Sequence, residues 1–186
     1  LGETLNALGR SAQAIEALQA ALALDANVAE FHSSLGIALA DAGRLEEALA
    51  SCQRAIALKP GLAVAHLNAG NVLREKGFLD EAIAAYRAAL ERDPEFPEAY
   101  NNLGNALKHQ GKFGEALRCY EQALPLSRAV SDRGGEAATL NNLGLVYSAL
   151  GEREKALEFY NQALPLFRAV GDRGGEAATL NGLGVV

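Results

Sequence analysis

A glycine that recurs at a fixed interval is the feature of this sequence that most constrains its fold. The interval is 34 residues at first and 40 residues later, and the glycines are Gly2, Gly36, Gly70, Gly104, Gly144 and Gly184. Three further series keep the same phase: Gly9, Gly43, Gly77, Gly111 and Gly151; Ala14, Ala48, Ala82, Ala116 and Ala156; and Ala21, Ala55, Ala89, Ala123 and Ala163. A period of this length predicts stacked repeats, each of which contacts its neighbours.

Each repeat has the pattern of two helices joined by a turn. In the third repeat, one helical face with the spacing i, i+3, i+4, i+7 holds His66, Ala69, Gly70 and Leu73. Gly77 follows, and glycine adopts the left-handed conformation of a helix end at little cost. A second face holds Ala82, Tyr86 and Ala89, and Pro94 lies just beyond it.

These positions resemble the tetratricopeptide repeat. The matching residues are Leu103, Gly104, Leu107, Gly111, Ala116, Tyr120 and Ala123 in the fourth repeat, and Leu35, Gly36, Leu39, Gly43, Ala48, Cys52, Ala55 and Pro60 in the second. The resemblance implies an all-α, right-handed superhelical solenoid of antiparallel helix pairs, with a concave groove lined by the first helix of each pair. It divides a single array over residues 1–186 into repeats at about 1–28 (partial), 29–62, 63–96, 97–134, 135–174 and 175–186 (partial).

The two longer repeats contain a nearly duplicated stretch. Residues 124–144 read LPLSRAVSDRGGEAATLNNLG, and residues 164–184 read LPLFRAVGDRGGEAATLNGLG. We expect the second helix to extend past Pro125 and Pro165 and then to turn at the Asp-Arg-Gly-Gly stretch. The 34-residue repeats resemble arrays of the O-GlcNAc-transferase type and the 40-residue repeats those of the kinesin-light-chain type, so the pitch should change near residue 130.

Asparagines recur on the helix face opposite the packing face. At about 100° per residue, Tyr100, Leu103, Gly104 and Leu107 share the face toward the second helix, and the amides lie nearly opposite. The resemblance implies that this opposite face lines the groove. The predicted peptide-binding residues are Asn68, Asn71, Arg74, Asn101, Asn102, Asn105, Lys108, Asn141 and Asn142.

A carboxamide both donates and accepts hydrogen bonds, so it can hold the N–H and C=O groups of an extended peptide. The asparagines resemble the ladder along the groove of O-GlcNAc transferase, which implies binding with little reading of side chains. The alternative is that they bond neighbouring first helices or water. Some modules of this family grip a terminal carboxylate with Lys and Arg, but the corresponding positions here are Val64, Leu67, Glu98, Ala138 and Asn141. Arg74 and Lys108 could still attract an acidic peptide.

Composition narrows the partners. The net charge of −6 and the pI of about 5.1 disfavour nucleic acid or an anionic membrane surface, which select clustered Lys and Arg. Cys52 and Cys119 have no metal-ligand spacing, and His32 and His66 occupy packing positions. We therefore expect no metal, cofactor or catalytic site, a protein or peptide partner, and a cytoplasmic location.

Three functions stay open. The first is a peptide-binding scaffold. The second is a self-assembling array, because the sequence begins partway through a first helix and ends in a first helix without its partner, which leaves Leu180, Leu183 and Val186 as self-association residues. The third is an accessory substrate-binding domain of a larger enzyme, such as a protein glycosyltransferase.

Overall fold

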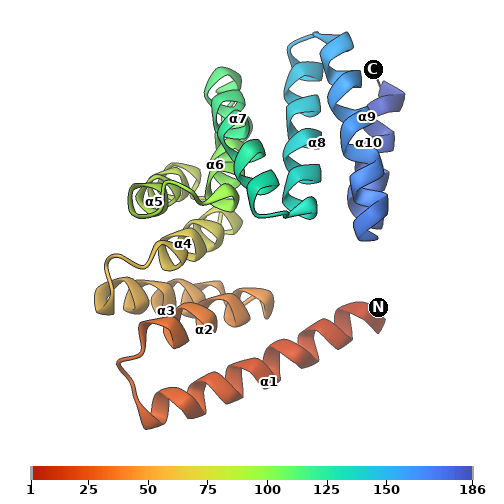
Figure 1. The fold of residues 1–186 in the computed structure, drawn as a ribbon. Coiled ribbons are helices and arrows are strands. Elements are labelled where there is room, and N and C mark those ends of the chain that lie inside the picture. Colours follow the sequence, from red (N-terminus) through yellow and green to blue (C-terminus); the bar gives the residue numbers. More distant parts are fainter. Residues whose placement is uncertain (1, 186) are drawn as a thin grey trace. The chain divides into compact units, whose positions relative to one another are not determined.

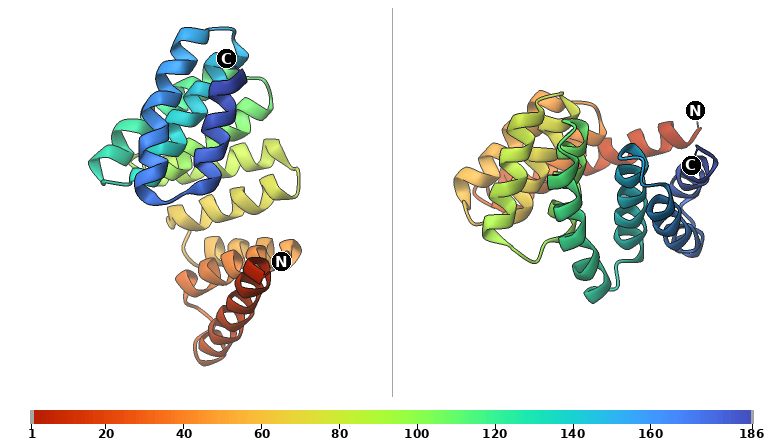
Figure 2. Two further views of the ribbon diagram at one scale, coloured as in Figure 1. Left: turned by 90° about the vertical axis from the view of Figure 1, so that its right-hand side faces the viewer. Right: turned by 90° about the horizontal axis from the view of Figure 1, so that it is seen from above.

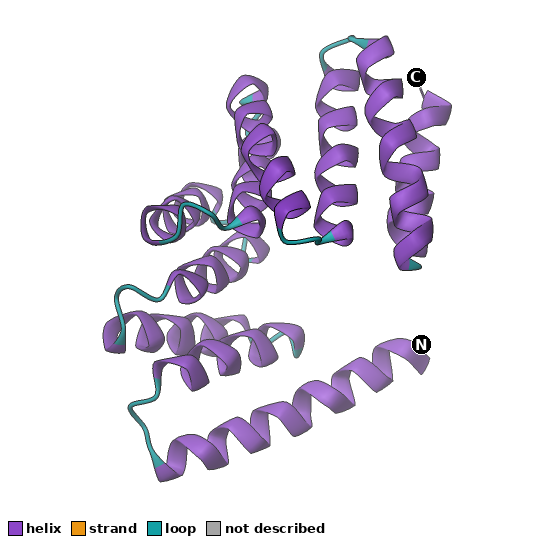
Figure 3. Cartoon of the chain, viewed as in Figure 1, coloured by secondary structure: helices purple, strands orange, loops and turns teal. Residues whose placement is uncertain are grey.

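The computed structural model describes the backbone of residues 2–185 and the side chains of residues 10–184, and all regular structure in this part is α-helical (Figures 1 and 3). The ten helices of the described residues are α1 (Gly2–Leu24), α2 (Ala29–Asp41), α3 (Leu45–Leu58), α4 (Ala63–Glu75), α5 (Leu79–Arg92), α6 (Pro97–His109), α7 (Phe113–Ala129), α8 (Arg133–Ala149), α9 (Arg153–Val170) and α10 (Arg173–Val185). None of these helices is both long and apolar enough to cross a lipid bilayer.

The helices form two compact units, residues 1–94 and 95–186. Within each unit every helix packs against the next one in the chain, from α1 to α5 in the first unit and from α6 to α10 in the second. Figures 1 and 2 show α8, α9 and α10 side by side. The predicted all-α array of sequential helix pairs is confirmed.

The phased glycines mark where a second helix approaches the first. A Cβ atom at Gly70, Gly104 or Gly144 would lie 2.5, 2.5 or 2.6 Å from the ring of the tyrosine on its paired helix. These rings are Tyr86, Tyr120 and Tyr160, and all three are buried. Glycine is needed here because the ring occupies the space of a side chain. At Gly36 the same space is taken by the Sγ atom of Cys52.

The longer repeats extend their second helices as predicted. α7 continues through Pro125 and α9 through Pro165. Proline removes one hydrogen bond to the carbonyl four residues earlier, and Glu121 and Asn161 at those positions are exposed, where water can replace the lost donor.

The Asp-Arg-Gly-Gly stretch is not a turn, as the sequence suggested, but the start of a helix. α8 begins at Arg133, and Asp132 caps it by accepting a hydrogen bond from the Gly135 N–H at 2.9 Å. Gly135 has no room for a side chain, because a Cβ atom there would collide with the Asp132 Oδ2 atom. The aspartate is therefore an N-cap, the residue type that stabilises the first turn of a helix.

The first repeat differs from the predicted helix pair. Gly9 is in phase with the turn glycines 43, 77, 111 and 151, whose φ angles are positive, yet α1 runs through it without a break. A glycine inside a helix costs only about 1 kcal/mol. The helix can therefore continue through Gly9.

Candidate functional site

The first helices lie closer together than the second helices in each unit. α2 contacts α4 in the first unit, and α8 contacts both α6 and α10 in the second, whereas no contact joins α7 to α9 in the described chain. Within the second unit the first helices thus form the inner layer. We call its candidate surface the inner face, which comprises Glu98, Asn101, Asn102, Asn105, Lys108, Asn141 and Asn142.

Several predicted amides bond from one first helix to the next. The Nδ2 group of Asn68 donates to Ser33 Oγ at 3.0 Å, and Asn68 is buried. In the second unit, Asn142 Nδ2 donates to Asn101 Oδ1 at 3.2 Å, and Asn141 Oδ1 lies 3.0 Å from Thr179 Oγ1. These are the contacts of the alternative interpretation, in which the asparagines join neighbouring first helices.

Two other amides lie nearer the second helix than the periodicity predicted. The Tyr86 hydroxyl donates to Asn71 Oδ1 at 3.0 Å, and the Tyr120 hydroxyl donates to Asn105 Oδ1 at 2.9 Å. Each tyrosine ring crosses the glycine just before its asparagine, which brings the hydroxyl to the amide. Asn71 and Asn105 therefore lie at the border between the packing face and the inner layer. The prediction from periodicity that they lie opposite the second helix is wrong.

The two predicted cations have different surroundings. Arg74 is exposed and forms no ion pair with the described residues. Lys108 is half-buried, and its Nζ atom donates to Asn142 Oδ1 at 3.2 Å. Burial lowers the pKa of Lys108 from its usual value. Asn102 is half-buried on the same helix.

One inner-face residue, Glu98, was absent from the residues predicted to bind peptide. It is exposed in the first turn of α6, and neither a hydrogen bond nor an ion pair reaches it from the described residues. Partial desolvation by the surrounding protein raises the pKa of its carboxyl group, and the nearby charge of Asp132 raises it further. The sequence signal was its contrast with Val64 and Ala138, which occupy the same position in the adjacent repeats.

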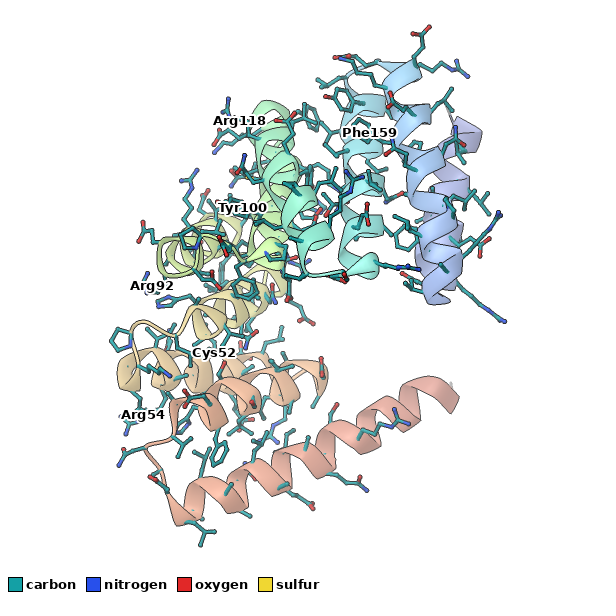
Figure 4. The ribbon with its side chains drawn as sticks, viewed as in Figure 1. Cys52, Arg54, Arg92, Tyr100, Arg118 and Phe159 are labelled. Carbon is teal, nitrogen blue, oxygen red and sulfur yellow. The ribbon has the colours of Figure 1, made fainter. Side chains whose placement is uncertain are left out.

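The histidines and Cys52 have structural contacts. The Nε2 atoms of His32 and His66 lie 2.9 and 3.0 Å from the carbonyl oxygens of Ala26 and Pro60, at equivalent places in successive repeats. Arg92, labelled in Figure 4, donates to the same Pro60 carbonyl at 2.6 Å. Cys52 is fully buried, and burial raises the pKa of its thiol to about 11, so the reactive thiolate is scarce at neutral pH.

The predicted self-association residues lie on α10. Leu180 is 45% exposed, whereas Leu140 at the same position in α8 is 1% exposed because α9 covers it. Leu183 is partly buried against the cluster of Ala156 and Tyr160. Val186 lies outside the described residues.

Comparisons with known proteins agree on one family. Models of the tetratricopeptide repeat match residues 1–63, 70–111 and 95–169. No curated protein sequence matches the chain. Among solved structures, TTC0263, a thermophilic tetratricopeptide repeat protein of Thermus thermophilus, is 22% identical with a TM-score of 0.77, over 98% of this chain and 95% of that one.

Two further structures extend the likeness. A crystal structure of MamA is 23% identical with a TM-score of 0.72, over 92% of this chain and 96% of that one. PilF of Pseudomonas aeruginosa is 26% identical with a TM-score of 0.70, over 75% of this chain and 61% of that one.

Proposed function

Because the chain is a tetratricopeptide repeat protein, a class that generally mediates protein–protein interaction, we propose that it is a scaffold that binds an extended peptide on the inner face of its second unit. The proposal extends to the amide ladder, in which successive asparagines contact the peptide backbone. For the first unit we propose a separate set of peptide contacts, Asn68, Asn71 and Arg74. For the ladder to bind a peptide backbone, the amides must keep hydrogen-bonding groups that no neighbouring residue uses.

The orientation of the inner-face amides supports this function. An ammonium group can only donate, so the amide atom of Asn142 that faces Lys108 must be its oxygen. The amide nitrogen of Asn142 therefore points toward Asn101. The Asn101 oxygen therefore accepts, and its NH₂ group has no partner among the described residues. Asn105 is likewise held through its oxygen by Tyr120. The internal contacts thus fix the amides and leave N–H donors for peptide carbonyls.

The best test separates the donor role of Asn105 from its contact with Tyr120. Asn105→Ala alone would leave a buried tyrosine hydroxyl without a partner, which costs about 1 to 3 kcal/mol. The double variant Asn105→Ala, Tyr120→Phe removes both groups together. Peptides selected by the wild type from a random nonapeptide library should bind the double variant about tenfold more weakly, as expected for the loss of one or two backbone hydrogen bonds.

Tyr120→Phe is the matched control, because it removes the same hydroxyl but keeps the Asn105 NH₂ group, so it should bind these peptides more tightly than the double variant. Circular dichroism and urea denaturation would establish that all three proteins are folded. If the wild type selects no peptide, or if the double variant binds as well as the control, the ladder is structural and the proposed function is rejected.

A second function, head-to-tail self-association, is favoured by a different observation. Among the described residues, no second helix packs on the outer face of α10, and Leu180 is exposed there. α1 holds the second-helix residues Ala14, Leu18 and Ala21, which are only half-buried, whereas Cys52 and its neighbours at these positions in α3 are fully buried. A cavity of about 390 Å³ lies between α1 and α2. α10 of another copy could pack there and complete a helix pair, and the oligomeric state in solution tests this.

A further inference from the structure

The inner face of the second unit carries a cation without a counterion. Lys108 is half-buried, its one hydrogen bond is to the neutral amide of Asn142, and no carboxylate of the described residues forms an ion pair with it. An ammonium group has three N–H donors, so two are unused. A half-buried charge without an opposite charge is unfavourable relative to a paired one. An anion at this point would therefore be stabilised.

The opposite end of α6 carries the complementary feature. Glu98 is exposed in the first turn, where a ligand can reach it, and no cation of the described residues pairs with it. The negatively charged Asp132 of the neighbouring helix cap is close enough to raise its pKa. The combined negative potential of these two carboxyl groups favours a cation at Glu98. Lys108 lies on the side of α6 toward α8, since it donates to Asn142, and the charge of Asp132, the N-cap of α8, acts on Glu98.

The repeat fold does not require these two charges. The position of Glu98 is filled by Val64 in the preceding repeat and Ala138 in the following one. At the position of Lys108, the preceding repeat has another cation, Arg74, and the following repeat has Ser148. The α6 helix thus combines a carboxylate and an ammonium group at positions where the adjacent α8 helix has two small uncharged residues.

Resting on the proposed peptide-binding function, we infer that the peptide is held in one direction by its charges, with an acidic side chain at Lys108 and a basic side chain at Glu98. Lys108 lies ten positions after Glu98 in the same α-helix, which corresponds to about 15 Å along the axis at 1.5 Å per residue. An extended peptide rises about 3.3 Å per residue. The ligand therefore has its acidic and basic residues about four to five positions apart, and the amides of Asn101 and Asn105 contact the backbone between them.

The test uses acetylated and amidated nonapeptides of serine and alanine with one glutamate and one lysine, and fluorescence anisotropy as the readout. The charges are placed four or five positions apart in both orders, and next to each other as a spacing control. A peptide with two glutamines in their place is neutral. One order at the longer spacing should bind about fivefold more tightly than the neutral peptide, the size of an exposed to half-buried ion pair.

Two isosteric variants assign each charge. Lys108→Gln keeps a donor for the Asn142 oxygen, and Glu98→Gln keeps the shape of the carboxyl group, so both should fold like the wild type. Each should abolish the preference for the corresponding charge in the peptide. The double variant Lys108→Glu, Glu98→Lys should prefer the opposite order.

The outcomes separate the two proposals. If the charged and neutral peptides bind with equal affinity, or if order and spacing have no effect, the charge assignment is wrong and the backbone-binding function stands. If no peptide binds, neutral or charged, both are rejected. A preference that survives Lys108→Gln and Glu98→Gln would place the charge recognition elsewhere and overturn the assignment.

Discussion

At the scale of single residues, the contact between a glycine and a tyrosine ring holds each helix pair together. A Cβ atom at Gly104 would lie 2.5 Å from Cε1 of Tyr120, and the hydrogen bond to Asn105 prevents the ring from turning away freely. Gly104→Ala should therefore lower the free energy of unfolding by about 1 to 3 kcal/mol despite the better helix propensity of alanine. Urea denaturation measures this.

Gly114 provides the control for this substitution. It lies in the first turn of α7, is exposed, and has open space around a Cβ atom. Gly114→Ala should raise the free energy of unfolding by about 0.5 to 1 kcal/mol through propensity alone. Equal effects at the two positions would show that the tyrosine ring yields and that the close contact is not required.

The same residues show what the sequence could predict about the site. Periodicity predicted that Gly104 faces the second helix, because it shares a helical face with Tyr100, Leu103 and Leu107. Periodicity could not predict the partner of Asn105. Asn105 is turned about 100° away from Gly104 around the helix, yet the long Tyr120 side chain extends past Gly104 and reaches it. The hydrogen bonds among Asn101, Asn142 and Lys108 depend on the position of α8 relative to α6. The residue pattern within a single helix carries no information about that position.

At the scale of elements, the two longer repeats differ at the ends of their second helices. Just after α7, Ser131 has a φ of 57°, and just after α9, Gly171 has a φ of 73°. This left-handed conformation costs a residue with a Cβ atom about 1 kcal/mol, and replacement by glycine removes that cost, although the greater freedom of unfolded glycine offsets part of the gain.

We therefore expect Ser131→Gly to raise the free energy of unfolding by about 0.5 to 1 kcal/mol and Gly171→Ser to lower it by a similar amount. The twin repeats make each substitution the control of the other, because the flanking sequence is shared. Thermal and urea denaturation of the two variants would measure the changes. Two changes of the same sign would mean that contacts of the serine side chain, and not backbone conformation, decide stability at this corner.

The element scale also shows why sequence reasoning failed at two places. The pattern predicted the extension of α7 and α9 correctly, because helical spacing continues past Pro125 and Pro165. It misread Asp132 to Gly135 as a turn, since glycine-rich stretches usually are turns, whereas here a ring or a carboxylate fills the space of the side chain at Gly135 and Gly175. The sequence did not predict an uninterrupted α1, because Gly9 occupies the repeat position at which the other glycines form turns. That position alone does not show whether the chain turns there and forms two packed helices.

At the scale of the whole molecule, the proposed self-association joins two different open helix surfaces. α10 presents Leu180 at the position where Leu140 is covered by a second helix, and α1 with α2 presents a cavity lined by Ala14, Leu18 and Ile37. Contact between two different surfaces joins copies head to tail and continues indefinitely unless the rotation closes a ring. Self-association should therefore increase steadily with concentration, as light scattering would show.

Single substitutions can block either surface. Leu180→Gln and Ile37→Arg each place a polar group in one surface, and both residues are exposed, so both variants should fold and remain monomeric. Leu145→Gln is the control, because Leu145 is also an exposed leucine but belongs to α8 and does not line the α1–α2 cavity, and this variant should associate like the wild type. Leu183 is less suitable, since it packs against α9.

A mixture of the two blocked variants distinguishes head-to-tail contact from a symmetric dimer. Each variant keeps the surface that the other lacks, so Leu180→Gln and Ile37→Arg together should form a heterodimer that grows no further. If the same patch paired with itself in a symmetric dimer, one of these variants alone would still dimerise and their mixture would form no new species. A wild type that stays monomeric at every concentration would reject self-association and leave the inner face as the working surface of the scaffold.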